Sequence, residues 1–191
     1  MSMNISEITG QPCSGKSTYI SRIFLNNQDH ETNDGGFIQK FYFFFNGVIY
    51  LETFRIRKLL EWSLKEDASI FFKLNIFRNA VSKFGMFNKR NVINKKKSRN
   101  FMLDESISHL PFLFLETDTN IVVEFMLNEL QQVNVVFLKS PGKEKIKERL
   151  EFRGHKRLRF LSTAYFVSRN DEIEEALIQC YTYICQDFKV I

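Results

Sequence analysis

Short apolar stretches alternate along the chain with longer stretches whose apolar residues recur every three or four positions. The short stretches, at residues 5–9, 101–103 and 133–138, predict strands, and the periodic ones predict helices. This alternation is typical of a parallel sheet with helices on both faces, so we expect an α/β fold with three layers, α/β/α, around a central parallel sheet. The helices are expected at residues 17–25, 52–67, 68–84, 119–132, 141–153 and 168–185, and a last short strand at 188–191.

Residues 37–51 interrupt the alternation. Two runs rich in aromatic and β-branched residues flank Asn46-Gly47, and this dipeptide favours a two-residue hairpin turn. We therefore expect a β-hairpin insertion near residues 37–51, whose Phe side chains belong to the core or line a ligand pocket. Gly85 is expected to end the helix before it, so that the polar and basic residues 86–100 form an exposed loop.

The predicted strand at 5–9 runs directly into Gly10-Gln-Pro-Cys-Ser-Gly-Lys-Ser17, which fits the pattern G-x-x-x-x-G-K-[ST]. A loop of this kind wraps a phosphate chain with its backbone N–H groups, and Gly10 and Gly15 permit its tight turns. Lys16 is expected to bind the β- and γ-phosphates, and Ser17 to offer its hydroxyl to Mg²⁺ at a helix N-terminus that favours anions. The expected nucleotide-binding residues are Gly10, Cys13, Ser14, Gly15, Lys16, Ser17 and Thr18.

Two acidic residues, Asp104 and Glu105, follow the predicted strand at 101–103. In enzymes with a phosphate loop, a strand that ends in acidic residues completes the metal site, so Asp104 is expected to hold Mg²⁺ directly or through water. Glu105 would orient or deprotonate the attacking nucleophile. The alternative for both is a strand that enters a solvated turn. His109 lies just beyond, where a lone His is more often structural than in contact with a substrate.

Composition sets further limits. The chain has 191 residues, of which 44% are hydrophobic, enough to bury the core of a single domain over 1–191. No apolar run approaches the roughly 18 residues that a membrane-spanning helix needs. The three Cys residues show neither a disulfide framework nor a zinc-type spacing, and no secretory signal precedes the first strand, so a cytoplasmic location is expected.

The net charge of +5 is concentrated in two basic blocks. Such blocks suit nucleic acids and phosphorylated small molecules equally well, but no RNA- or DNA-binding motif accompanies them, so a nucleic-acid partner is not expected. The sequence does not predict an oligomeric state. One block spans residues 143–159, and the other consists of Lys89, Arg90, Lys95, Lys96, Lys97 and Arg99.

Three segments together resemble the P-loop kinases of nucleosides, nucleotides and other small metabolites, within the broader class of P-loop NTPases. They are the phosphate loop, Leu103-Asp104-Glu105, and the strand at 135–138 followed by Lys147-Glu-Arg-Leu-Glu-Phe-Arg-Gly-His-Lys-Arg157. The third is similar to the lid of such kinases, so the resemblance implies a lid around residues 149–163 with Arg149, Arg153 and Arg157 near the phosphates. The resemblance does not extend to residues 37–85, and the chain has no clear counterpart of the acidic residue–Arg pair that often positions the acceptor.

The resemblance implies an ATP- and Mg²⁺-dependent kinase that transfers the γ-phosphoryl group to a nucleoside, nucleotide or other metabolite. Lys16, Arg153 and Arg157 would neutralise the charge of the transferred group, and Glu105 would receive the proton of the acceptor. ATP is favoured over GTP because no guanine-reading motif is present. Two alternatives stay open, namely a P-loop ATPase that acts as a switch or accessory factor through a protein partner, and a nucleotide-dependent nucleic-acid binder.

Overall fold

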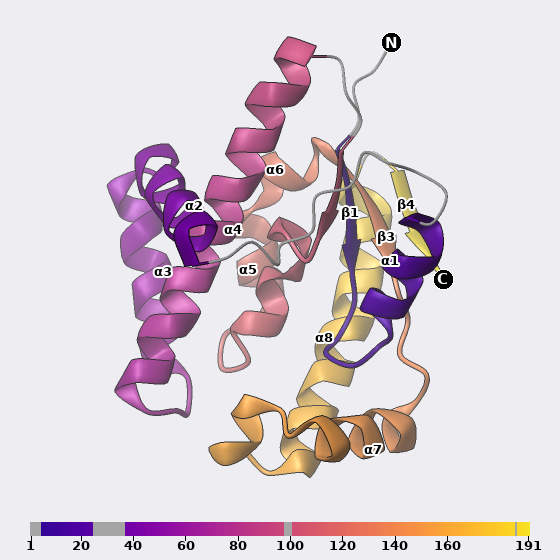
Figure 1. Cartoon of the computed structure of the whole chain (residues 1–191). Helices are drawn as coiled ribbons and strands as arrows, with labels where there is room; N and C mark the ends of the chain where they lie inside the picture. The colour runs from indigo at the N-terminus through magenta and orange to yellow at the C-terminus, as the bar shows by residue number, and fades with distance from the viewer. Residues whose placement is uncertain (1–4, 25–36, 98–100, 186) are drawn as a thin grey trace.

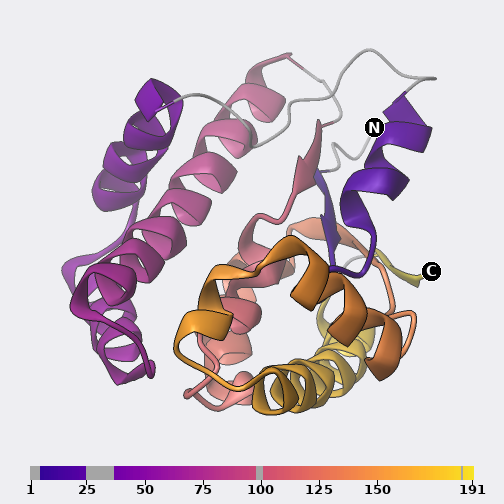
Figure 2. The ribbon, with the colours of Figure 1, turned by 60° about the horizontal axis from the view of Figure 1, so that its bottom comes forward.

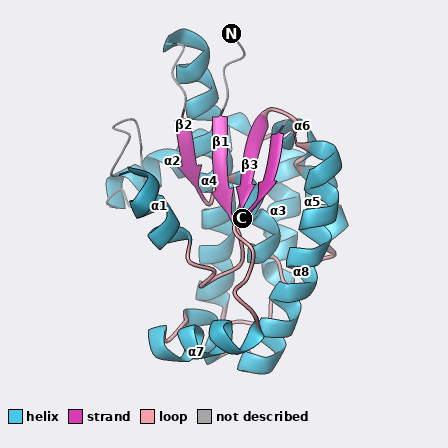
Figure 3. Ribbon diagram, turned by 90° about the vertical axis from the view of Figure 1, so that its right-hand side faces the viewer, coloured by secondary structure: helices cyan, strands magenta, loops and turns pink. Residues whose placement is uncertain are grey.

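The central sheet consists of four parallel strands in the order β2-β1-β3-β4 (Figure 3). The computed structural model describes residues 5–24, 37–97, 101–185 and 187–191 (Figure 1). The strands agree with the α/β fold and the strand positions expected from the sequence. They are β1 (Ile5–Thr9), β2 (Phe101–Asp104), β3 (Val133–Phe137) and β4 (Asp187–Val190).

Helices lie on both faces of this sheet, as expected for a three-layer fold. On one face α1 packs Ile20 against Ile8 of β1 and Leu138. The larger core lies on the other face, where Leu177 of α8 and Leu103 of β2 belong to one buried cluster. The helical elements are α1 (Lys16–Phe24), α2 (Phe37–Tyr50), α3 (Thr53–Lys65), α4 (Ile70–Lys97), η1 (Ile107–Leu113), α5 (Thr119–Phe125), α6 (Leu127–Leu130), α7 (Lys143–Arg153), η2 (Lys156–Arg159) and α8 (Thr163–Ile184).

The helix boundaries differ from the expected ones at several places. Helix α7 begins at Lys143 and not at residue 141. The stretch 119–132 is divided at Met126, which leaves the helical backbone geometry between α5 and α6. The last helix begins before residue 168, because the Ser162 side chain accepts a hydrogen bond from the backbone N–H of Tyr165 and caps α8 there. No helix of the described residues is long and apolar enough to cross a membrane.

The expected β-hairpin at 37–51 is wrong, because these residues form helix α2. Asn46-Gly47 lies in the middle of that helix, where the Asn46 amide donates to the carbonyl of Tyr42 at 2.8 Å. Phe43 and Gly47, four residues apart, are buried on the face that meets α4. Gly47 is thus needed for close approach and not for a turn: a Cβ there would lie 2.1 Å from the carbonyl oxygen of Val81.

Gly85 does not end a helix, and this expectation was also wrong. Helix α4 continues through it to Lys97, and Met86 and Phe87 are buried where an exposed loop was expected. A Cβ on Gly85 would lie 1.9 Å from the carbonyl oxygen of Phe43 and 2.5 Å from the nitrogen of Gly47. The two glycines therefore let the backbones of α2 and α4 touch.

Helices α2, α3 and α4 form one side of the molecule, next to the β2 edge of the sheet (Figures 1 and 2). Trp62 of α3 joins them to the main core through its ring contacts with Phe114 and Phe125. One basic block falls partly within α4, where Arg90 is buried and the ammonium of Lys89 lies over the ring of Tyr42. Of this block, Arg90 is therefore not part of an exposed basic surface.

The contact between Gly47 and Gly85 gives a prediction about stability. Replacing Gly by Ala inside an unconstrained helix stabilises it by about 1 kcal/mol. Gly85→Ala is expected to do the opposite and to lower the free energy of unfolding by about 1–3 kcal/mol, because the new methyl group overlaps backbone atoms of α2. Urea unfolding followed by circular dichroism measures the change. Val92→Ala, on an exposed part of the same helix, is the control and should change stability by less than about 0.5 kcal/mol.

Candidate nucleotide-binding site

The phosphate loop connects β1 to α1 and has the backbone geometry that the sequence pattern requires. Gly10 has φ 149°, and a Cβ there would lie 2.4 Å from the carbonyl oxygen of Leu138. At Gly15 the reason is different, because no atom blocks a Cβ but φ is 107°. Cys13 adopts a left-handed φ of 67°, and the N–H of Ser14 donates to Gln11 at 3.2 Å. The loop is thus a compact turn of the kind that binds anions through backbone N–H groups.

Lys16 begins α1, and its side chain lies back across the loop. The ammonium donates to the carbonyl oxygens of Gly10 and Gln11 at 2.9 and 2.8 Å, and the residue is only 6% exposed. It also forms an ion pair with the carboxylate of Glu105 at 2.9 Å. The predicted phosphate-binding lysine and the predicted base are therefore in direct contact.

Glu105 is the first residue after β2 and has a left-handed φ of 52°. This conformation costs a residue with a side chain about 1–3 kcal/mol, so the surrounding contacts must maintain it. Its N–H donates to the carbonyl of Ile8 at 3.0 Å, and its carboxylate lies 2.9 Å from Lys16 and 3.6 Å from His109 Nε2. Burial alone would raise the pKa of Glu105, but His109, Lys16 and Lys83 together lower it, and the carboxylate is ionised at neutral pH.

His109 is buried in η1 and faces this carboxylate. Burial lowers its pKa to about 3, although the negative charge of Glu105 acts in the opposite direction. The imidazole is therefore neutral at physiological pH. The ring also lines a cleft, so both the structural and the substrate-facing role of His109 stay open.

Asp104 and Ser17 lie at the same edge of the sheet, the one where β1 and β2 end. Parallel pairing places Ile8 opposite Asp104, and Ser17 is exposed in the first turn of α1. Among the described residues no group of three or more His, Cys, Asp or Glu side chains forms a metal site by itself. One carboxylate and one hydroxyl fit Mg²⁺, which usually binds through few protein ligands together with waters and phosphate oxygens.

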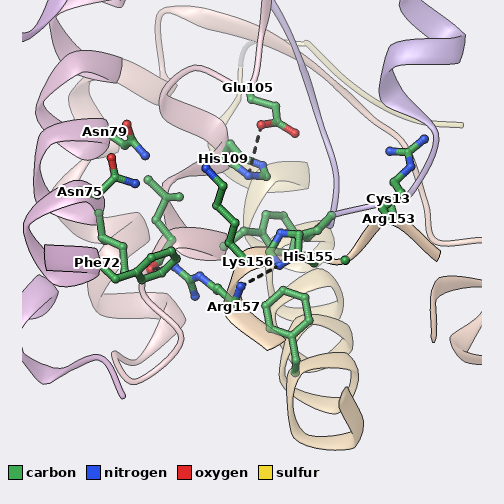
Figure 4. Close-up of a pocket in the computed structure, with 16 residues that line it drawn as sticks. Cys13, Phe72, Asn75, Asn79, Glu105, His109, Arg153, His155, Lys156 and Arg157 are labelled. Atoms are coloured by element: carbon green, nitrogen blue, oxygen red, sulfur yellow. Dashed lines mark hydrogen bonds and ion pairs between the residues drawn. The ribbon is translucent and has the colours of Figure 1, made fainter. Parts of the chain in front are cut away.

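Two clefts lie on either side of the phosphate loop. The first, which we call the α4 cleft, has a volume of about 580 Å³ and is bordered by α4, η1 and the segment after α7 (Figure 4). The second, the α7 cleft, has a volume of about 730 Å³ and lies between α1 and α7. Pro12 and Cys13 line the first, and Ser14, Gly15 and Thr18 line the second, so the loop separates the two spaces.

The two clefts differ in chemistry. The α4 cleft is lined by the Phe72 ring and the amides of Asn75 and Asn79 from α4, together with Glu105 and His109. Its basic lining residues are Arg153, Lys156 and Arg157. In Figure 4 Asn75 and Asn79 lie on successive turns of α4, across the cleft from Cys13 and Arg153. The α7 cleft is strongly basic. Its charged lining residues are Arg22, Lys145, Glu148, Arg149 and Arg153.

The three arginines of the expected lid occupy different positions. Arg149 donates to the carbonyl of Cys13 in the loop at 2.9 Å, and Arg153 lines both clefts. Arg157 also borders the α4 cleft, but its guanidinium pairs with Glu66 of the α3–α4 connection at 3.4 Å and donates to Leu113. Gly154 explains this separation, since its φ of 62° ends α7 between Arg153 and Arg157.

Several residues at the site were missed in the sequence. Lys83 and Glu7 are buried near Glu105. Neither residue belongs to a sequence motif, because segments far apart in the sequence bring them together. Asn75 and Asn79 carried a usable signal, since two amides spaced by four share one helix face. Gln11 connects the loop to α8, because its amide donates a hydrogen bond to Glu174 at 3.2 Å.

The architecture has counterparts among solved structures. Two structures of deoxyadenosine kinase from M. mycoides, one with bound dATP and one with the products dCMP and a flexible dCDP, match with 14% and 15% sequence identity. Both have a TM-score of 0.53, and the matches cover 98% of this chain and 90% and 88% of the kinase chains. This chain has the fold of the P-loop nucleoside kinases. No family model matches the sequence, and no curated protein is significantly similar to it.

The positions of Arg153 and Arg157 in this P-loop kinase fold predict different consequences of mutation. Arg157→Ala leaves Glu66 buried without its charge partner, although the N–H of Glu116 still donates to it at 3.1 Å, so the change is expected to lower the free energy of unfolding by about 3–5 kcal/mol. Arg153→Ala removes an exposed side chain and should change stability by less than about 0.5 kcal/mol. Urea unfolding of both variants makes the comparison. Equal stability of the two would show that the Glu66–Arg157 pair does not anchor the segment after α7.

Proposed function

We propose that this protein is an ATP-dependent kinase that phosphorylates a hydroxyl group of a nucleoside. The observation that carries the proposal is the pair of clefts on opposite sides of one phosphate loop, with Arg153 lining both. A kinase needs separate sites for donor and acceptor that meet at the transferred phosphoryl group. The loop, Lys16 and Glu105 lie at that meeting point.

The α7 cleft suits the donor. A nucleoside triphosphate carries several negative charges, and this cleft presents four basic side chains and one acidic one beside the N-terminus of α1. The loop N–H groups and Lys16 would hold the β- and γ-phosphates, with Ser17 and Asp104 as ligands of Mg²⁺. When bound, Mg²⁺ neutralises charge on the phosphate oxygens of the donor.

The α4 cleft suits a nucleoside acceptor. The Phe72 ring offers a surface for stacking. The oxygens of Asn75 and Asn79 accept hydrogen bonds from Arg78 at 2.6 and 3.2 Å, which leaves their NH₂ groups as donors to the edge of a nucleobase. The volume of about 580 Å³ is typical of a small-molecule site. The fold points the same way, because the similar solved structures are of a deoxyadenosine kinase, one of them with bound dATP.

Within this arrangement Glu105 would receive the proton of the acceptor hydroxyl. Glu105 lines the α4 cleft, and its carboxylate, which is ionised at neutral pH, lies 2.9 Å from the ammonium of Lys16. Lys16 would leave Glu105 for the phosphates, and Arg153 would add positive charge as the phosphoryl group moves from one cleft to the other. For Arg157 a direct role stays a prediction from the resemblance, because its guanidinium is held by Glu66 in this structure.

A P-loop ATPase that acts through a protein partner is the second candidate. It would use the same loop, lysine and Mg²⁺ ligands, but it would need only the α7 cleft. The α4 cleft, which contains amides at two successive turns of α4 and the candidate base, favours the kinase.

Nucleotide binding is tested by a thermal shift. ATP with Mg²⁺ at about 100 times its dissociation constant is expected to stabilise the folded state by about 2.7 kcal/mol, which corresponds to about 5–10 °C for a chain of this size. Lys16→Ala should remove most of this shift, because the β- and γ-phosphates lose their charge partner. Lys147→Ala, on the exposed side of α7, is the control. A full shift in the Lys16 variant would contradict the assignment of the loop.

Phosphoryl transfer is tested with a panel of ribo- and deoxyribonucleosides and labelled ATP, with the products separated by chromatography. At least one nucleoside monophosphate is expected to form. Asp104→Asn should lower kcat by at least about 100-fold while the folded protein still binds metal-free ATP, since a strand-end carboxylate serves the metal and not the core.

The same assay identifies the acceptor cleft. Asn79→Leu keeps a similar volume but removes the amide, so it should raise the KM for the nucleoside about 5- to 100-fold and leave the KM for ATP unchanged. Asn88→Leu, further along α4 and outside the cleft, is the matched control. ATP hydrolysis without phosphorylation of any nucleoside would favour the ATPase instead.

A further inference from the structure

Lys83 is a buried cation that none of the roles above uses. It lies on α4, is 8% exposed, and belongs neither to the phosphate loop nor to either cleft. Its ammonium donates to the main-chain carbonyl oxygen of Glu105. A side chain of α4, a helix outside the predicted P-loop motifs, thus contacts the residue that is proposed as the base.

The contact is made at a strained point of the backbone. Glu105 has a left-handed φ of 52°, a conformation that a residue with a side chain rarely adopts without support. Its N–H is held by the carbonyl of Ile8 in β1, and its carbonyl is held by Lys83. The backbone of Glu105 is therefore fixed on both sides, and the fixed backbone sets the direction in which the carboxylate leaves the turn.

The surroundings of Lys83 argue against a residue that only fills space. Burial lowers the pKa of its ammonium, whereas the carboxylates of Glu105, Glu7 and Asp104 raise it. Burying a charge among charges is seldom the most stable solution, and well-packed apolar residues often replace buried ion pairs without loss of stability. A buried ammonium thus makes the folded state less stable than an apolar side chain of similar size would. We therefore expect that its hydrogen bond to Glu105 serves another purpose.

We propose that Lys83 is a positioning residue of the kinase reaction, which holds the left-handed turn of Glu105 so that its carboxylate stays directed at the acceptor hydroxyl. This inference rests on the proposed function, in which Glu105 is the base. In this inference the two lysines have different roles. Lys16 contacts the carboxylate in this structure but is needed by the phosphates of the donor, whereas Lys83 holds the main chain and stays in place when Lys16 leaves.

The test compares Lys83→Met with the wild-type protein in steady-state kinetics. Met is one atom shorter than Lys, so it keeps most of the side-chain volume and removes the hydrogen bond. The expected result is a fall in kcat of about 10- to 100-fold, the size expected when a base is misplaced, with the KM for ATP within twofold of wild type. Lys83→Arg should restore part of the loss, because a guanidinium keeps the charge and the donors but not the geometry.

Two further variants separate positioning from folding. Lys89→Met, on the same helix with its ammonium over Tyr42, removes an equal charge away from the site and should keep the wild-type kcat. If Lys83→Met unfolds because Glu7 loses its counter-charge, the double variant Glu7→Gln/Lys83→Met removes one charge of each sign and is measured in its place. The inference would be overturned by a wild-type kcat in Lys83→Met, or in Glu7→Gln/Lys83→Met if only the double variant folds.

A double-mutant cycle with Glu105→Gln distinguishes failure of this inference from failure of the proposed function. If Lys83 acts through Glu105, Lys83→Met should cause no further loss in the Glu105→Gln background. A loss of the same factor in both backgrounds would show that Lys83 acts elsewhere. A wild-type kcat for Glu105→Gln alone would instead refute the base assignment on which the inference rests. Should no nucleoside be phosphorylated, the cycle is measured on ATP hydrolysis, where the same pattern is expected from a Glu105 that orients water.

Discussion

The ion pair between Lys16 and Glu105 is the contact on which the rest of the site depends. It forms because β1 and β2 are parallel and in a register that sets Ile8 opposite Asp104, so that the phosphate loop and the acidic turn leave the sheet side by side. The Glu105 N–H donates back to Ile8 and completes this junction. A shift of one residue in the pairing would turn the β2 side chains to opposite faces and separate the lysine from the carboxylate.

A second constraint lies away from the sheet, where α2 and α4 touch at Gly47 and Gly85. This contact fixes the position of α4, and α4 carries both the amides of the α4 cleft and Lys83. The acceptor side of the proposed site therefore depends on a backbone contact far from the chemistry. The donor side depends on the loop, α1 and α7, and is built mostly from residues close to the P-loop motifs.

This division explains what could be predicted from the sequence. The phosphate loop, Asp104 and the parallel sheet follow local rules, because a turn that wraps phosphate or a strand between two helical layers needs particular residues in a row. Gly47 and Gly85 led to wrong predictions, a hairpin turn and a helix end, because their role depends on a contact between two helices and not on local sequence. A glycine that allows two helices to approach has the same local appearance as one in a turn or at a helix end, and only the partner helix decides between them. Lys83 and Glu7 were missed for the same reason, since their meaning comes from a contact between distant segments.

The arginines after β3 show how a spacing can mislead within a single segment. Arg149, Arg153 and Arg157 recur every fourth residue and would share one face of an uninterrupted helix. Gly154 ends α7 with φ 62°, so only Arg149 and Arg153 share that face, beside the loop and the α7 cleft. Arg157 follows the turn into the core, where Glu66 holds it and burial raises the pKa of that carboxyl to about 7, against the opposing effect of the Arg157 charge. The segment is thus anchored to the α3–α4 connection at one end and exposes Arg153 at the other, between the two clefts that the proposed reaction must connect.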